Sequence, residues 1–83
     1  MTDYVYLVIG VIPFEEETVC YVSSNIENAI EKIEEFSKYA PMNYYKYFDI
    51  EKHYIDSDKD SEECKSFKKT FKDGKRVFEE VKE

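Results

Sequence analysis

Residues 4–12 read YVYLVIGVI, a run in which β-branched and aromatic side chains occupy both alternating sets of positions. A strand that is apolar on both sets is typical of a central position, where it has neighbours on each side and little contact with water. We therefore expect this strand to lie in the middle of a sheet, and the other elements to assemble around it.

The chain is expected to turn back directly after this strand. Pro13 cannot continue a central ladder because it lacks an amide hydrogen, and Phe14 and the three acids of residues 15–17 follow it. Residues 18–22 read TVCYV and return to the composition of a strand. The sequence therefore predicts a β-hairpin with an acidic tip.

A helix is predicted after the second strand. Ser24 and Glu27 have the spacing of a capping box, in which the first side chain accepts from the amide three residues on and the second reaches back. Pro41 is expected to end the helix, because it lacks a donor and restricts the residue before it. Apolar residues recur at steps of three and four, at Ile26, Ala29, Ile30, Ile33, Phe36 and Ala40. This stripe should pack on the sheet.

Residues 44–56 alternate with a period of two, as a third strand would. The alternation places Tyr44, Phe48, Ile50 and Tyr54 on one side, and Tyr45, Tyr47, Asp49, Glu51 and His53 on a second, hydrated side. A right-handed crossover through the helix would put this strand beside the first, which gives the sheet order 2-1-3. The predicted fold is therefore α+β, a small ββαβ sheet with one amphipathic helix on one face.

The rest of the chain is expected to complete a single domain, since 83 residues provide one hydrophobic core. Residues 57–63 contain no apolar side chain, and we interpret them as a polar connector. They would join a core over residues 3–56 to a basic C-terminal segment over residues 64–83.

The C-terminal segment has two readings. Asp73 and Gly74 form a pair that favours a tight hairpin turn, and apolar residues such as Phe71 and Val77 flank it. The alternative is a helix that starts near Ser61 and ends before Gly74 as its C-terminal cap. Residues 61–83 are therefore expected to form either a hairpin or a helix.

Several of these features occur together in one order. A strand rich in Tyr and Val is followed by an acidic loop, by a second strand ending Val22-Ser23-Ser24, by an amphipathic helix, and by the pattern Phe48-x-Ile50-x-x-x-Tyr54-Ile55-Asp56. In this order, residues 4–56 resemble a family of small uncharacterised phage and bacterial proteins. The resemblance implies the ββαβ order and a phage or mobile-element origin, and it carries over no catalytic residue. The tail departs from the family, because it is longer, basic and without Trp.

Charge is distributed unevenly along the chain. Residues 1–63 carry 15 acids and 5 lysines, whereas residues 64–83 carry 7 basic residues and 4 acids. The net charge of −7 repels nucleic acid and anionic membranes, and it favours a protein partner with a basic surface. No stretch approaches the roughly 20 apolar residues of a membrane span, and Asp3 stands where a signal peptide would be positive. We therefore expect a cytoplasmic protein, located in the host cell if it is phage-encoded, with no membrane partner.

No catalytic or metal-binding motif is found in the sequence. A structural zinc site needs four ligands, and only Cys20, Cys64 and His53 are of the Cys or His type. Without a secretion signal both thiols are expected to be reduced. The carboxylates of residues 56–62 lack the sixth-position Gly and twelfth-position Glu of an EF-hand loop. We therefore expect no metal, no cofactor and no enzyme activity.

The hydrated side of the third strand is the leading candidate for a binding surface. Tyr offers a large contact area, and carboxylates beside it can accept bidentate hydrogen bonds from Arg. Acids of the hairpin tip and of the exposed side of the helix would add to it. The predicted partner-binding residues are Tyr45, Tyr47, Asp49, Glu51, Glu15, Glu16, Glu17, Glu27, Glu31, Glu34 and Glu35. The leading interpretation is a non-catalytic acidic binding module, in the form of a phage-encoded inhibitor or modulator. It would occupy a basic surface of a host or defence protein, including one that binds nucleic acid.

Two alternatives belong to other classes. A second copy of the chain could cover the open sheet face, which would make the protein a self-associating, homodimeric accessory protein. The second alternative is a small nucleic-acid-binding accessory protein that uses the basic C-terminal segment. Its basic run, interleaved with Phe67 and Phe71, has a composition typical of nucleic-acid contacts and comprises Lys65, Lys68, Lys69, Lys72, Lys75 and Arg76. Pairing of these cations with the acidic body, or protection of an edge strand, is the more ordinary explanation of the run.

Overall fold

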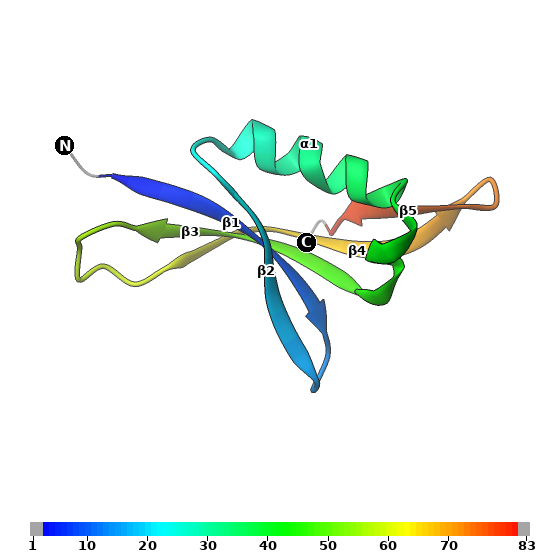
Figure 1. Ribbon diagram of the computed structural model, residues 1–83, viewed down its shortest axis with the longest axis horizontal. Coiled ribbons are helices and arrows are strands. Elements are labelled where there is room, and N and C mark those ends of the chain that lie inside the picture. Colours follow the sequence, from blue (N-terminus) through cyan, green and yellow to red (C-terminus); the bar gives the residue numbers. More distant parts are fainter. Residues whose placement is uncertain (1–2, 82–83) are drawn as a thin grey trace.

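The central strand of the sequence has neighbours on both sides in the computed structural model, which describes residues 3–81. A single sheet contains β1 (Tyr4–Ile12), β2 (Glu16–Ser23), β3 (Tyr47–Tyr54), β4 (Glu62–Lys72) and β5 (Lys75–Glu80). One α-helix, α1 (Ile26–Ser37), follows β2 and packs on one face, and a short 3-10 helix, η1 (Ala40–Tyr44), leads into β3 (Figure 1). The α+β class with one helix is confirmed.

The sheet is larger than the predicted one. Its strand order is β2-β1-β3-β4-β5, and every neighbouring pair is antiparallel. The second, first and third strands are neighbours, but the predicted order 2-1-3 describes only part of a sheet that continues through β4 and β5. The C-terminal segment forms the hairpin rather than the helix, because Asp73 and Gly74 both adopt the positive φ that a tight turn between twisted strands needs.

The core lies between α1 and the sheet. Its largest fully buried side chains are Val8, Ile33, Phe48 and Ile50. Phe67 of β4 and Phe78 of β5 join them, and the ring centroids of Phe48 and Phe78 are 4.7 Å apart. The sequence predicted a core over residues 3–56. The observed core extends beyond them, because the C-terminal hairpin supplies two of its aromatic rings.

The ends of α1 differ from those predicted. The helix begins at Ile26, so Asn25 rather than Ser24 is its cap, and the Asn25 side chain accepts from the amide of Asn28 at 2.8 Å. Glu27 is then the second helical residue and cannot complete a capping box with Ser24. The helix ends at Ser37, three residues before the last predicted stripe position, and the turn that contains Pro41 is the 3-10 helix.

Arg76 of β5 closes the C-terminus of α1. Its Nη2 donates to the carbonyl oxygens of Phe36 at 3.4 Å, Ser37 at 3.2 Å and Tyr39 at 2.9 Å. The Ser37 hydroxyl in turn accepts from the amide of Phe78 at 3.1 Å. The bond to Ser37 satisfies a carbonyl at the end of the helix, where no further turn can supply a donor, and together the bonds fasten an edge strand to the helix.

Replacing Arg76 with Ala is expected to lower the free energy of unfolding by about 1.5–3 kcal/mol, the usual range for hydrogen bonds made by a charged group. Lys75→Ala provides the matched control, because this neighbouring cation is exposed beside the turn. Urea unfolding followed by circular dichroism measures both variants. Equal loss of stability in the two would contradict the capping role of Arg76.

Candidate protein-binding face

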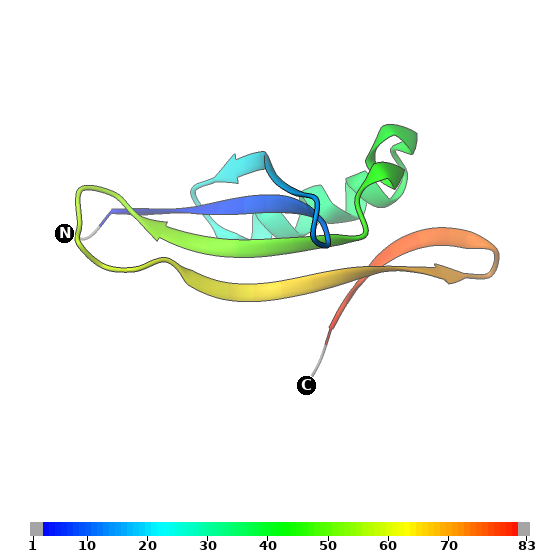
Figure 2. The same ribbon diagram turned by 90° about the horizontal axis from the view of Figure 1, so that it is seen from below.

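The face of the sheet opposite α1 has no helix or strand packed on it within residues 3–81, and we call it the open face. Figure 2 views the molecule from this side, with the sheet drawn in front of α1. The core cluster gathers on the other side of the sheet, around Ala29, Ile33 and Phe36 of the helix. On the open face the side chains of β1 and β2 are half-buried or exposed, apart from Ile9, which is 8% exposed.

Aliphatic side chains line the open face along β1 and β2. The register pairs Leu7 with Val22 and Ile9 with Val19, and these two valines are 53% and 51% exposed. They share a face although they are three residues apart, because a β-bulge at Cys20 inserts one extra residue into β2. We call the following set the apolar band: Val5, Leu7, Ile9, Val11, Val19 and Val22.

Three carboxylates lie beside the apolar band on β3 and β4. Asp49 is the β3 partner of Ile9, Glu51 is the partner of Leu7, and Glu63 of β4 lies directly opposite Glu51. Like charges in directly opposed positions destabilise a sheet. Glu63 takes part in none of the ion pairs found within residues 3–81. Asp49, Glu51 and Glu63 form what we call the carboxylate row.

The carboxylate row has two local polar contacts. Asp49 accepts a hydrogen bond from the Ser66 hydroxyl at 2.6 Å, which holds the two strands together at this point. Glu51 contacts Nε2 of His53 at 2.9 Å, and both side chains are partly exposed. Glu63 therefore remains the member of the row whose charge has the least local compensation.

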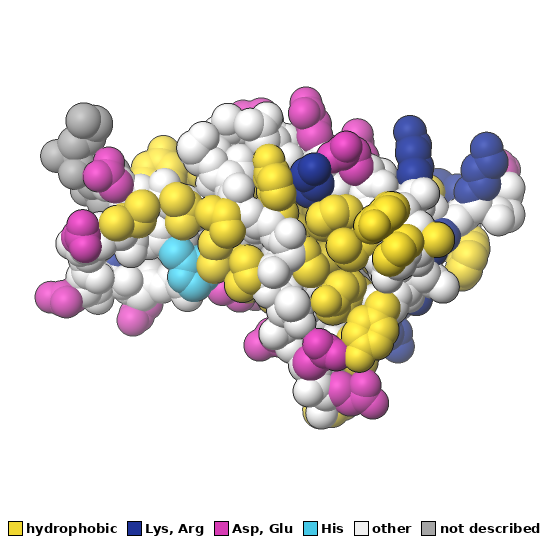
Figure 3. Space-filling model, viewed as in Figure 1, with side chains coloured by type: hydrophobic (Ala, Val, Ile, Leu, Met, Phe, Trp, Pro, Cys, Tyr) yellow, Lys and Arg dark blue, Asp and Glu magenta, His cyan; other side chains and the backbone are white. Residues whose placement is uncertain are grey.

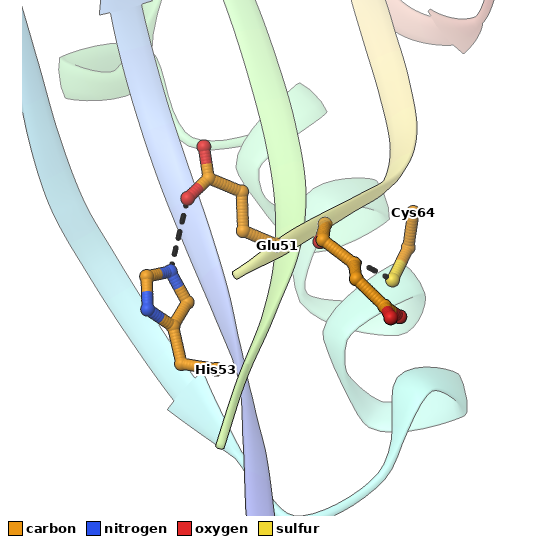
Figure 4. Close-up of polar contacts among 4 residues, drawn as sticks. Glu51, His53 and Cys64 are labelled. Atoms are coloured by element: carbon orange, nitrogen blue, oxygen red, sulfur yellow. Dashed lines mark hydrogen bonds and ion pairs between the residues drawn. The ribbon is translucent and has the colours of Figure 1, made fainter. Parts of the chain in front are cut away.

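The histidine and the cysteines do not come together. Figure 4 shows Glu51 and His53 pointing toward each other, while the Cys64 side chain lies apart from them with its Sγ 3.8 Å from the carbonyl oxygen of Glu62. Cys20 packs against the core on the helix side. Within residues 3–81, no group of three or more His, Cys, Asp or Glu side chains is arranged to hold a metal ion.

The two tyrosines of the predicted binding surface lie on opposite sides of the sheet. Tyr47 is half-buried on the open face, between Val11 of β1 and Lys68 of β4. Tyr45 precedes β3 and packs against the core, with its ring centroid 5.5 Å from that of Phe48. The prediction that Tyr45 lies on the hydrated side was wrong, because the strand alternation begins only after η1.

The acids of the β1–β2 tip are divided by the pleat. Glu17 is the partner of Val11 and lies on the open face, and Glu15 lies in the turn. Glu16 lies on the helix side, where it accepts hydrogen bonds from the hydroxyls of Tyr44 and Thr18. The bond from Tyr44, and then that from Thr18, lowers the pKa of the Glu16 carboxyl. Only Glu17 of the three extends the open face.

The acids of α1 belong to a separate surface. Glu27, Glu31, Glu34 and Glu35 are all exposed, and Glu35 pairs with Lys32 at 2.9 Å. Because α1 packs on the opposite side of the sheet, its outer side cannot form one contact surface with the carboxylate row. The structure therefore separates two sets of residues that the sequence placed together.

The predicted basic run is spread over both faces of the β4–β5 hairpin. Figure 3 shows Lys and Arg side chains gathered at that end of the molecule, with acidic side chains at the opposite end and at the β1–β2 tip. Four of the six cations have local partners: Lys65 with Glu80, Lys69 with the carbonyl of Asn43, Lys72 with Glu79, and Arg76 with the helix. Lys68 and Lys75 remain exposed.

Sequence reasoning missed Glu63 and the exposed valines. Glu63 had been assigned to the polar connector, whereas β4 begins at Glu62. The facing of Val19 and Val22 depends on a bulge, and nothing in their spacing indicates one. No local signal assigns Glu63 to a strand, because most of the residues that follow it are polar or charged.

No protein-family model, curated protein or solved structure matches this chain. The fold and the open face therefore define its class as a small α+β protein with one uncovered sheet face. None of the helices within residues 3–81 is long and apolar enough to cross a membrane.

Proposed function

We propose that this chain is a non-catalytic protein-binding module that uses its open face to bind an apolar and basic surface of another protein. The observation that carries the proposal is the apolar band lying directly beside the carboxylate row. The first offers area that gains from leaving water, and the second offers negative charge that selects the partner.

The apolar contribution comes mainly from β2. Val19 and Val22 are about half exposed, so a partner that covers them buries surface that now contacts water. At roughly 25 cal/mol per Å² of apolar surface, each valine adds on the order of 1 kcal/mol. This supports binding, but it gives little specificity because any apolar surface would serve.

The charged contribution comes from the facing pair Glu51 and Glu63. Their mutual repulsion in the free protein is relieved when a cation enters between them. An Arg guanidinium suits this position, since it presents several donors in a plane and can bind two carboxylates at once. A second copy of the chain would instead bring another carboxylate row to the same face, which adds like charge.

In its finer form, the proposal is a phage-encoded inhibitor or modulator in the cytoplasm that occupies a basic surface of a host or defence protein. The resemblance over residues 4–56 and the net charge of −7 support this form. The open face would then cover the surface that the target protein uses for its own ligand.

Charge reversal of Glu63 tests the proposal. Glu63→Lys is expected to weaken capture of the partner at least about tenfold, because it places a cation against the basic partner surface. The same change removes the repulsion with Glu51, so the free energy of unfolding should stay equal or rise. The measurement is a pull-down from a nuclease-treated lysate of the source cells at low and moderate salt, read by mass spectrometry.

Glu31→Lys is the matched control for this experiment. It makes the same change of charge at an exposed acid on the outer side of α1. Retention of the partner by Glu31→Lys and its loss by Glu63→Lys would support the open face. The reverse result would move the contact to the helix, and binding that does not change with salt would contradict the charged contact altogether.

A further inference from the structure

We infer that the element received by the open face is an amphipathic α-helix of the partner, with an apolar stripe and a row of Arg or Lys along one flank. This inference rests on the proposed function and names the class of ligand that the face would take. It follows from the length, the width and the asymmetric charge of the face.

The length of the apolar band fits a helix of about four turns. Val5 and Val11 are six positions apart on β1, which corresponds to roughly 20 Å of strand. A helix rises about 1.5 Å per residue, so some 13 residues would cover this distance. The band is therefore long enough to receive apolar side chains at steps of three and four over several turns.

The width of the band also fits one helix. Neighbouring strands lie about 4.8 Å apart, so β2, β1 and β3 together span roughly 10 Å between the outer two strand axes. A helix with its side chains is about 10–12 Å across. A partner helix centred on β1 would thus reach the valines of β2 on one side and the carboxylates of β3 on the other.

The charge on the two sides of this axis is unequal. The β2 side carries Val19 and Val22 beside the centre of the band and Glu17 only near the hairpin tip, whereas the β3 and β4 side carries the carboxylate row, with Lys68 beyond it opposite Tyr47. At the level of Leu7 and Ile9, a helix lying along β1 would therefore meet apolar surface on one flank and negative charge on the other. Its complement has Arg or Lys at positions that lie beside the apolar stripe on one flank only.

The layer structure of the molecule favours a helix over a strand. α1 covers the sheet from the other side and contacts β1, β2, β3 and β5. A helix on the open face would complete a three-layer arrangement in which both sheet faces are covered. A strand added to the outer edge of β2 or β5 would satisfy backbone groups but would leave the apolar band in water.

Two designed peptides of 18 residues test the inference. Both carry Leu at helical steps of three and four, and one has Arg along a single flank where the other has Glu. Methyl NMR spectra of the protein are recorded during titration, and circular dichroism reports the helix content of the peptide. We expect the Arg peptide to shift the methyl signals of Leu7, Val19 and Val22, to gain helix, and to bind at least about tenfold more tightly than the Glu peptide.

Val19→Asp is the matched variant, with Tyr39→Asp as its control, because both side chains are about half exposed and Tyr39 lies outside the sheet, between α1 and η1. Binding of the Arg peptide should be lost in Val19→Asp and kept in Tyr39→Asp. Shifts confined to α1, or equal affinity for the two peptides, would overturn the inference. So would the absence of shifts up to millimolar peptide, or methyl shifts that follow protein concentration alone.

The two proposals fail separately. If the pull-down recovers a partner that Glu63→Lys loses, while the Arg peptide gives no methyl shifts, the open face binds a protein but not through a helix. If Glu63→Lys retains every partner that the unmodified chain captures, the proposed function itself is wrong.

Discussion

Replacing Phe48 with Ala is expected to lower the free energy of unfolding by about 3–5 kcal/mol, the usual cost of removing a buried ring from a packed core. Phe48 is fully buried, and its ring lies 5.3 Å from that of Phe36, 5.5 Å from that of Tyr45 and 4.7 Å from that of Phe78. It therefore joins β3, the helix, β5 and the residue that follows η1 in one cluster. Small domains have a stability of roughly 5–15 kcal/mol, so this change would remove a large fraction of the total.

The control for this variant is Phe14→Ala. Phe14 lies at the tip of the β1–β2 hairpin and is fully exposed. Its removal should change the free energy of unfolding by less than about 0.5 kcal/mol. Urea titrations of the two variants measure the difference, and a loss of less than about 1 kcal/mol for Phe48→Ala would show that the core is not centred on this ring.

Gly10→Ala is expected to lower the free energy of unfolding by about 1–3 kcal/mol, the usual cost of overfilling a packed site. A Cβ atom at position 10 would lie 2.6 Å from Cδ1 of Tyr45 and 2.7 Å from two other carbons of the ring. The ring lies directly over the backbone of β1, so it must move before an additional methyl group can enter. Glycine is required here for close approach and not for its backbone conformation.

A double-mutant cycle isolates this contact. In a Tyr45→Ala background the clash is absent, so the further change Gly10→Ala should cost almost nothing. Thermal unfolding of the four proteins provides the comparison. Equal costs of Gly10→Ala in the two backgrounds would mean that the glycine acts on the strand itself rather than through the tyrosine.

Local patterns predicted the elements whose physics is local. The composition of residues 4–12 indicated a strand with two neighbours, because a strand that is apolar on both sides has to be covered on both sides. The apolar stripe of the helix was predicted for the same reason, and Ala29, Ile33 and Phe36 are indeed buried. The Asp73-Gly74 pair indicated the hairpin through its turn geometry, although the sequence was also compatible with a helix in this segment.

The long-range arrangement was less accessible. The fourth and fifth strands join the sheet because Phe67 and Phe78 are buried in the core cluster. Their burial depends on the packing of the whole chain, which local sequence patterns do not describe. The two bulges depend on the register between strands, which a single sequence does not contain. For this reason Glu63 and the facing of Val19 and Val22 could not be derived.

The residues of the open face were predicted in part. Tyr47, Asp49 and Glu51 do lie on the face away from the core cluster, since the alternation of β3 is regular from Tyr47 onward. The prediction that they form one surface with the acids of α1 was wrong, because the outer side of the helix and the open face of the sheet point in opposite directions. The cations of the tail were predicted as one run, but a strand distributes successive residues to opposite faces.

Both cysteines occupy the extra position of a β-bulge, Cys20 in β2 and Cys64 in β4. Deletion of either cysteine would remove the extra residue and leave a regular ladder, with Lys65 still opposite Ile50 and Glu63 still opposite Glu51 in the case of Cys64. At these two positions β2 and β4 can therefore lose one residue without changing which side chains lie opposite each other. In homologous chains we expect single-residue deletions within these strands to fall at Cys20 or Cys64.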